Sequence, residues 1–180
     1  MRKIIYTISA LFVLALASCS KGDGDLNYGL TKIYMPQAMA GGGITNIYNV
    51  PSGGGSDTYN FSEDDENYNV YLGVLRSGKE AGEGFSVEIV TDAAETSRQA
   101  KELEGYAMPS NVYTLPSSVS VEAGKNSASF SLTLNKAALK SHAGKKLVLC
   151  AGLANPSRYE LSENGTLVTI VVDVDALMAK

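Results

Sequence analysis

The 180-residue sequence has no tryptophan, one histidine and two cysteines. A nucleophile that needs histidine as its base has only His142 available, and that residue lies in a Lys/Gly-rich stretch. Cys150 lies in a run that is apolar on both faces, so we expect a small buried side chain rather than a reactive thiol. With no nucleophile elbow and no His/Cys cluster, the sequence predicts neither an enzyme nor a metal site or cofactor.

Positive charge is also scarce, because 15 Lys and Arg face 19 Asp and Glu. Without a basic stripe, we do not expect nucleic acid as a partner. The glycine triplets at 41–43 and 53–55 are not followed by Lys-Ser/Thr, so they do not predict a phosphate loop. The acidic residues 63–66 lack calcium-loop spacing and favour a solvated turn, with calcium binding as the alternative. Asp173 and Asp175 are expected on one strand face where the last strand leaves the core.

One long apolar run is present, from Ile4 to Ala17, and it follows two basic residues. It is shorter than the ~20 residues that span a bilayer and has the layout of a secretory signal. The segment Leu16-Ala17-Ser18-Cys19 resembles the lipobox of bacterial lipoproteins. That resemblance implies cleavage before Cys19, a diacylglycerol on its thiol, and a chain anchored to the membrane. The alternative is an ordinary cleaved signal with an incidental cysteine.

The residues after Cys19 are small and partly acidic, and they include Asp23 and Asp25. They resemble the surface-export signals of Bacteroidetes lipoproteins, although a solvated tether has the same composition. We therefore expect a signal peptide at 1–18, a flexible tether at 19–30, and an outer-membrane lipoprotein facing outward.

Period-two alternation dominates the rest of the chain and predicts strands with one buried face. The final run, 166–174, is apolar on both faces and is expected near the centre of a sheet. The turn residues Gly124-Lys125-Asn126 suggest a hairpin between the strands on either side. The alternating apolar positions are Val70, Leu72, Val74; Phe85, Val87, Ile89; Val119, Val121, Ala123; and Ala128, Phe130, Leu132, Leu134.

One helix interrupts the strands. Asp92 and Glu95 fit a capping box, and the helix is expected to run to Glu104, with Gly105 as a left-handed stop. Its thin apolar face suggests a crossover lying over an edge of the sandwich. A second short helix is predicted at 135–141. Together the elements predict an all-β fold, an Ig-like antiparallel β-sandwich with one short crossover helix, over residues 31–176.

Three sets of residues carry a wider resemblance. They are Tyr34-Met35-Pro36-Gln37-Ala38; Tyr106-Ala107-Met108-Pro109 with Tyr113-Thr114-Leu115-Pro116 and Val119 to Gly124; and Leu147-Val148-Leu149 with Tyr159-Glu160-Leu161-Ser162. In this order they resemble an uncharacterised Ig-like domain family of Bacteroidetes surface lipoproteins, found at the N-terminus of endo-β-N-acetylglucosaminidase-like proteins. The resemblance implies a sandwich linked to glycan-handling surface assemblies, with any catalysis in other domains.

These observations predict a non-enzymatic, accessory glycan-binding module. Aromatic faces stack on sugar rings, and Tyr48, Tyr59 and Tyr68 lie near the glycine-rich and acidic loops. They are the candidate ligand-binding residues, and the alternative for each is a half-buried strand tyrosine. The rival function is a structural or adhesin-type module that binds surface proteins through a strand edge.

Overall fold

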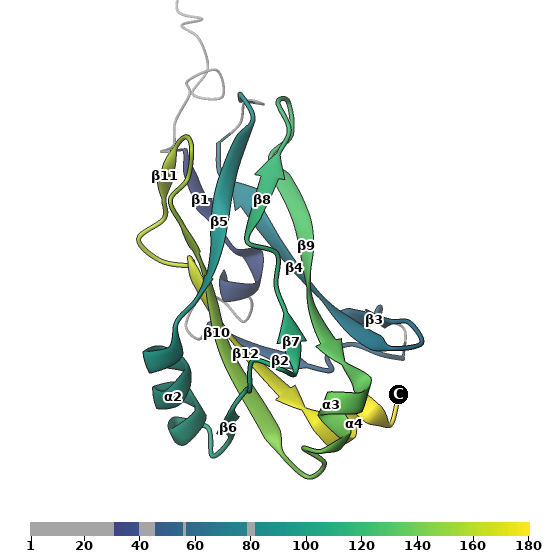
Figure 1. Ribbon diagram of the computed structural model, residues 1–180. Helices are drawn as coiled ribbons and strands as arrows, with labels where there is room; N and C mark the ends of the chain where they lie inside the picture. The colour runs from purple at the N-terminus through teal and green to yellow at the C-terminus, as the bar shows by residue number, and fades with distance from the viewer. Residues whose placement is uncertain (1–30, 40–45, 56, 79–81) are drawn as a thin grey trace, which may run out of the picture.

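The computed structural model describes residues 31–39, 46–55, 57–78 and 82–180. In this part of the chain two six-stranded sheets pack face to face, which confirms the predicted β-sandwich (Figure 1). The predicted lipidation site, Cys19, and the first glycine triplet lie outside the described residues. No helix in the described ranges is both long enough and apolar enough to cross a membrane.

Sheet A is built around the long pair β4–β9, and sheet B around β10–β12. In spatial order, sheet A holds β11 (Glu160–Leu161), β1 (Lys32–Tyr34), β4 (Asn67–Arg76), β9 (Ser127–Asn135) and β7 (Tyr113–Thr114), with β3 (Phe61–Glu63) beside β4. Sheet B holds β2 (Ile47–Val50), β12 (Leu167–Asp173), β10 (Lys146–Ala154), β5 (Phe85–Thr91) and β8 (Ser118–Val121), with β6 (Tyr106–Ala107) beside β10.

The sequence predicted an antiparallel sandwich, but some of the strand pairs are parallel. The central pairs are antiparallel, but β1–β11, β2–β12 and β6–β10 are parallel. Each parallel pair includes a short strand of two to four residues that is reached by a long connection, and alternation within a strand does not reveal such pairings.

The core lies between the sheets and is formed by the inward positions of the alternating strands. The expected central position of β12 is confirmed, because it pairs with β10 on one side and β2 on the other. The main core side chains are Val70, Leu72, Val74, Leu132 and Leu134 from sheet A, and Leu147, Leu149, Val168, Ile170 and Val172 from sheet B.

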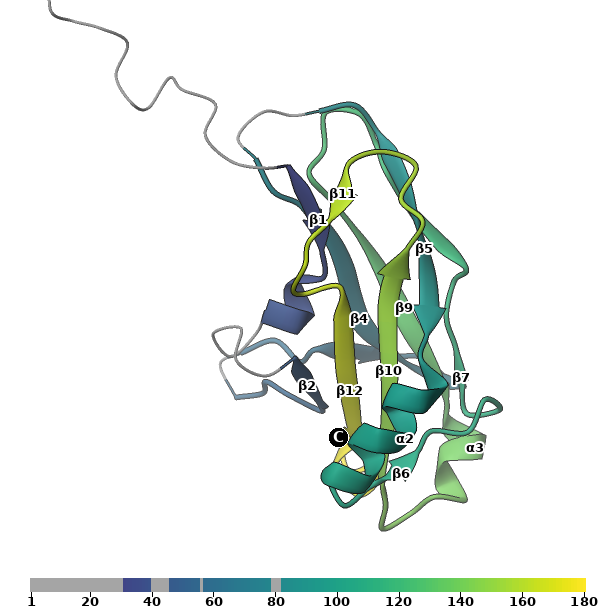
Figure 2. The same ribbon diagram turned by 90° about the vertical axis from the view of Figure 1, so that its left-hand side faces the viewer.

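Helix α2 (Ala93–Glu102) covers the outer face of sheet B, as Figure 2 shows. Ala100 packs there with Val148 and Val171, and the half-buried Ile47 and Leu103 border this cluster. The helix therefore lies over the middle of the sheet and not over an edge, which corrects the sequence prediction. Since β10 and β12 are apolar on both faces, their outward side chains need this cover.

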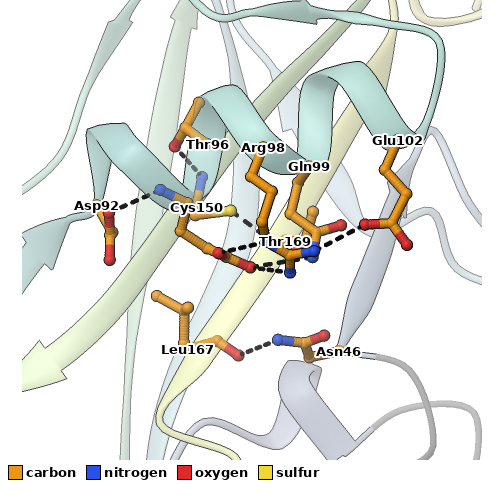
Figure 3. Close-up of polar contacts among 10 residues, drawn as sticks. Asn46, Asp92, Thr96, Arg98, Gln99, Glu102, Cys150, Leu167 and Thr169 are labelled. Carbon is orange, nitrogen blue, oxygen red and sulfur yellow. Dashed lines mark hydrogen bonds and ion pairs between the residues drawn. The ribbon is translucent and has the colours of Figure 1, made fainter.

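A buried hydroxyl fixes α2 to the sheet (Figure 3). Thr96 accepts a hydrogen bond from the backbone N–H of Cys150 at 2.9 Å, and the Cys150 sulfur lies 3.6 Å from the Thr169 hydroxyl. Cys150 is fully buried, as predicted, and burial raises the pKa of its thiol. The helix thus occupies the place on β10 where the neighbouring strand β5 has ended.

The predicted helix start is confirmed in part, and the predicted stop is wrong. The Asp92 carboxylate accepts from the N–H of Glu95 at 2.8 Å, but the Glu95 side chain pairs with Arg98 instead of reaching back. Glu104, with φ of 52°, takes the left-handed position that was assigned to Gly105. The N–H of Gly105 bonds to Ala100 O at 2.8 Å, which closes the helix. Position 105 favours glycine for another reason, because a Cβ there would lie only 3.0 Å from Lys146 O.

The turn at Gly124 joins two sheets and does not form a hairpin. β8 pairs with β5 in sheet B, whereas β9 pairs with β4 in sheet A. The turn itself forms as expected, with Gly124 at φ of 80° and the Lys125 N–H bonded to Glu122 O. Turn residues thus indicate where the chain reverses, but not which sheet it enters next.

Two short helices follow strands. α3 (Lys136–Lys140) confirms the short helix predicted at 135–141, and Asn135 is its N-cap. α4 (Val174–Met178) was not predicted, and it begins where Asp173 caps the N–H of Ala176. Asp173 and Asp175 therefore do not share a strand face, because Asp175 lies in the helix and accepts from the N–H of Gly144.

Candidate functional site

No α-helix covers the outer face of sheet A in the described part of the chain, and the outward side chains in the middle of β4 and β9 are polar and uncharged. At the β1 end the same face carries Leu75 and the Lys32–Glu160 ion pair. The strand register brings Asn69 opposite Thr133, and Tyr71 opposite Ser131. Ser62 lies beside Asn69, and Thr114 beside Thr133. We call this surface the polar face; its residues are Ser62, Asn69, Tyr71, Thr114, Ser129, Ser131 and Thr133.

Tyr71 is the aromatic centre of the polar face, and its side chain is 42% exposed. Both of its backbone groups are hydrogen-bonded: the N–H donates to Asn60 O at 3.0 Å, and the C=O accepts from the Tyr48 hydroxyl at 3.2 Å. A tyrosine presents an apolar ring and a polar hydroxyl together. The ring therefore projects from a strand that is fixed in position.

A hydrogen-bonded row beside Tyr71 fixes the neighbouring polar groups. The Thr133 hydroxyl donates to Asn69 Oδ1 at 2.9 Å, and Asn69 Nδ2 donates to Asp64 Oδ2 at 3.0 Å. The other Asp64 oxygen accepts from the backbone N–H groups of Glu66 and Asn67. These bonds, that of Glu66 foremost, lower the pKa of Asp64, so its carboxylate stays ionised as an acceptor.

The acidic residues 63–66 form the turn between β3 and β4, as the sequence suggested. Lys136 closes this turn, since its ammonium group donates to Glu63 Oε2 at 2.8 Å and to Asp64 O at 2.6 Å. No group of three or more His, Cys, Asp and Glu side chains in the described ranges is placed to hold a metal ion.

The predicted tyrosines face the core and not an open platform. Tyr68 is buried, and Tyr48 and Tyr59 are half-buried against the core. The Tyr59 and Tyr68 rings lie on either side of Phe61, at centroid distances of 5.4 and 5.7 Å. The ammonium group of Lys136 covers the Tyr68 ring at 4.8 Å. Their ligand-binding role stays a prediction, but the Tyr48 hydroxyl acts here on the backbone of Tyr71.

Sequence reasoning did not single out Tyr71, although the signal for its exposure was present. Along β4, Tyr71 shares the parity of Asn69 and Gly73, whereas Tyr68 shares the parity of Val70 and Leu72. Because side chains in a strand alternate between faces, this pattern alone assigns Tyr71 to solvent and Tyr68 to the core.

Three hollows lie near these elements. The largest, about 480 Å³, contains Tyr68 and Lys136, but the Lys136 contact occupies the ring. A groove of about 440 Å³ flanks α2 on sheet B. A third hollow, about 310 Å³, lies at the β1 end of sheet A and includes Tyr34, which pairs with Leu75 on the outer face. None of the residues that line this third hollow belongs to the polar face.

Comparison with known proteins identifies the family. Residues 32–151 match the model of a family described as a "-like, N-terminal domain". No curated protein matches the sequence.

Solved structures share the fold at low identity. A candidate carbohydrate binding protein from Bacteroides ovatus ATCC 8483 matches with a TM-score of 0.54 and 13% identity, over 78% of this chain and 36% of that one. A two-domain protein of unknown function from Bacteroides fragilis NCTC 9343 matches with a TM-score of 0.53 and 13% identity, over 80% and 45%. A protein of unknown function from Bacteroides ovatus gives 0.51 and 16%, over 81% and 46%.

The chain spans less than half the length of each of these three solved chains. The family match covers 120 of the 180 residues and includes the polar face. The chain therefore belongs to this family of N-terminal domains, which confirms the resemblance to an uncharacterised Bacteroidetes domain family.

Proposed function

We propose that this chain is a non-catalytic, accessory glycan-binding protein and that the polar face holds the sugar. The observation that carries the proposal is Tyr71, an exposed ring on an uncharged part of the sheet surface, beside the hydrogen-bonded side chains of Asn69 and Thr133. The ring stacks on the C–H face of a pyranose, while Asn69, Thr133 and Ser131 bond its hydroxyls. A sheet face that no described helix covers suits an extended polymer.

Two further observations support a glycan as the ligand. The residues of the polar face carry no charge, which fits a neutral polysaccharide better than a charged partner. The solved protein with a TM-score of 0.54 is itself described as a candidate carbohydrate binding protein. Since the chain spans 36% of that protein, its binding activity enters here as a proposal for the present chain.

The state of the nearest carboxylate supports binding without hydrolysis. A glycosidase needs one carboxylic acid whose pKa is raised so that it can donate a proton. The pKa of Asp64 is lowered instead, and both of its oxygens already accept hydrogen bonds. Asp64 therefore orients Asn69 and is unsuited to protonate a glycosidic oxygen.

The proposed location is the outer leaflet of the outer membrane, with the domain facing outward. It rests on the lipobox-like Leu16-Ala17-Ser18-Cys19 and the acidic tether that follows. A lipid on Cys19 would hold the glycan-binding domain within a tether length of the membrane, where a surface polysaccharide-handling assembly operates. Replacing Cys19 by alanine should release the chain from the membrane fraction. Retention of Cys19→Ala in that fraction would contradict the lipid anchor.

Affinity gel electrophoresis tests the binding proposal. The chain from Lys21 onward is run through gels that contain host or plant polysaccharides, and its mobility is compared with a gel without polysaccharide. We expect retardation by at least one neutral glycan, a loss of at least tenfold in affinity for Tyr71→Ala, and a smaller loss for Asn69→Ala.

The matched control is Tyr106→Ala. Tyr106 is 58% exposed but lies on β6, which belongs to sheet B, so retardation should persist. Retardation that survives Tyr71→Ala would move the site away from the polar face. Retardation by none of the polysaccharides would contradict glycan binding and favour the protein-binding alternative.

A further inference from the structure

β9 is a paired strand on one side and an open edge on the other. It pairs with β4 from Ser127 to Asn135, but β7 covers only Thr133 and Leu134 on the far side. Upstream of the turn, the chain runs through β8, which has crossed to sheet B and pairs there with β5 (Figure 1). Residues 127–131 thus form an edge of sheet A, which we call the open edge.

The hydrogen-bond parity shows which backbone groups point outward. Arg76 N–H donates to Asn126 O at 2.7 Å, so position 126 and the even positions of β9 direct their backbone groups to β4. Asn135 N–H donates to Val112 O at 2.9 Å, on the β7 side. The odd positions therefore direct their N–H and C=O groups away from β4. Within the described ranges no backbone partner is found for these groups at Ser127, Ser129 and Ser131.

We propose that the open edge pairs with the open edge of a second copy of this chain, antiparallel about a two-fold axis at Ser129. In that register Ser129 faces the second copy's Ser129, and Ser127 faces its Ser131. Each of these is a hydrogen-bonded pair that exchanges two backbone bonds, so the outward groups of both copies are satisfied together. The pairing uses one surface on both copies and closes as a dimer.

The length of the open edge fits this register. Position 133, where β7 begins to cover β9, would lie opposite position 125 of the second copy. At 125 the chain has already left the strand, because Gly124 and Lys125 form the turn. Each copy's β7 therefore meets the end of the other copy's open edge and does not compete with it for pairing.

The side chains of the open edge fit a second copy as well. Its residues carry no charge, so two copies of an acidic chain meet there without like-charge repulsion. Ala128 and Phe130 point inward and are only partly buried. In the proposed register the small Ala128 lies opposite the large Phe130 of the second copy, and pairing covers both. The outward serines would join two polar faces into one longer surface.

Site-directed cross-linking of the full-length chain in membranes tests the dimer. Ser129→Cys is treated with a short bis-maleimide, and the products are separated on a denaturing gel. Antiparallel hydrogen-bonded residues lie ~5.5 Å apart between Cα atoms, so the two thiols are within reach. We expect at least fivefold more dimer than in the parent chain, which gives the background; its Cys150 thiol is buried. Ser97→Cys, on the exposed face of α2, is the matched control and should stay at that background.

The register has its own test. Two copies of different size, one carrying Ser127→Cys and the other Ser131→Cys, should cross-link more than two copies that both carry Ser127→Cys. The latter residues would lie ~14 Å apart along the strand, at ~3.4 Å per residue. The proposal is overturned if Ser129→Cys gives no more dimer than Ser97→Cys, or if its product has the mass of a different partner protein. Neither outcome bears on glycan binding, which is measured separately.

Discussion

The outer faces of the two sheets are built from different residues and meet different surroundings. On sheet B, Val148 and Val171 are buried beneath Ala100 of helix α2. On sheet A, the equivalent outward positions hold Asn69, Tyr71, serines and Thr133, and no described helix covers them. One sandwich thus has an outer face committed to folding and an outer face left available for binding.

Under the proposed function, this difference separates stability from recognition. The apolar outer residues of β10 and β12 stabilise the fold only when α2 covers them, by about 25 cal/mol per Å² of apolar surface buried. A covering helix would add no stability at the polar face, so the requirement to fold does not determine which residues stand there. Substitutions on the two faces should therefore change different properties. Those on sheet B should lower stability, and those on sheet A should weaken binding.

The largest expected effect is the loss of the α2 interface. Val148→Asp places an unpaired carboxylate in a fully buried site and should lower the free energy of unfolding by about 3 kcal/mol or more. Ser131→Asp, on the polar face, should change it by less than about 0.5 kcal/mol. Urea unfolding of both variants measures the contrast. Equal losses would show that the two outer faces are not different in kind.

A smaller effect is expected where the helix is hydrogen-bonded to the sheet. Thr96→Val keeps the shape of the side chain but leaves the buried Cys150 N–H without its acceptor, which should cost about 1–3 kcal/mol. Ser97→Ala is the control, because that exposed hydroxyl bonds only within the helix, to Ala93 O. If both variants unfold at the parent's urea concentration, Thr96 does not fix the helix to β10.

Tyr71→Ala should have almost no effect on folding while it removes binding. Tyr71 is exposed and its hydrogen bonds are made by the backbone, so the free energy of unfolding should change by less than about 0.5 kcal/mol. Thermal unfolding, run beside affinity electrophoresis of the same preparation, separates the two effects. A large loss of stability would make Tyr71 a structural residue and weaken its assignment to the site.

The smallest expected effect is the pH dependence of α2. Hydrogen bonds from Arg98, and next from Gln99, lower the pKa of Glu95 to about 2. A lowered pKa contributes stability above the unfolded value, and this contribution is lost as the pH falls from about 4.5 to about 2. Glu95→Gln should flatten the decline of unfolding free energy in that interval. An unchanged acid slope would show that the Glu95–Arg98 pair is not formed in solution.

The contrast between the faces could largely be predicted from the sequence. Alternating Ser and Thr in β9 predicted a strand with one buried face, and the double-sided apolar run of β12 predicted a strand near the centre of a sheet. The sequence could not say that the helix at Ala93 would be the cover, since its thin apolar face, Ala100 and Leu103, suits several positions. Packing against Val148, distant in the chain, decides it.

The exposure of the candidate site residues was predicted less well, for a related reason. Tyr48, Tyr59 and Tyr68 were chosen by their closeness to loops in the chain, but strand parity decides exposure. The sequence also did not reveal that β8 and β9 belong to different sheets, because a turn such as Gly124-Lys125-Asn126 occurs in hairpins and in crossovers alike. The open edge of β9 follows from that crossover, so local sequence gives no sign of it.

Amide hydrogen exchange with and without a retarding polysaccharide tests the central claim most directly. We predict added protection in 69–73 of β4 and 129–133 of β9, on the polar face, and unchanged exchange in α2 at 93–102. Protection confined to α2 or to the groove beside it, or no added protection with any of the polysaccharides, would contradict the account of sheet A as the binding face.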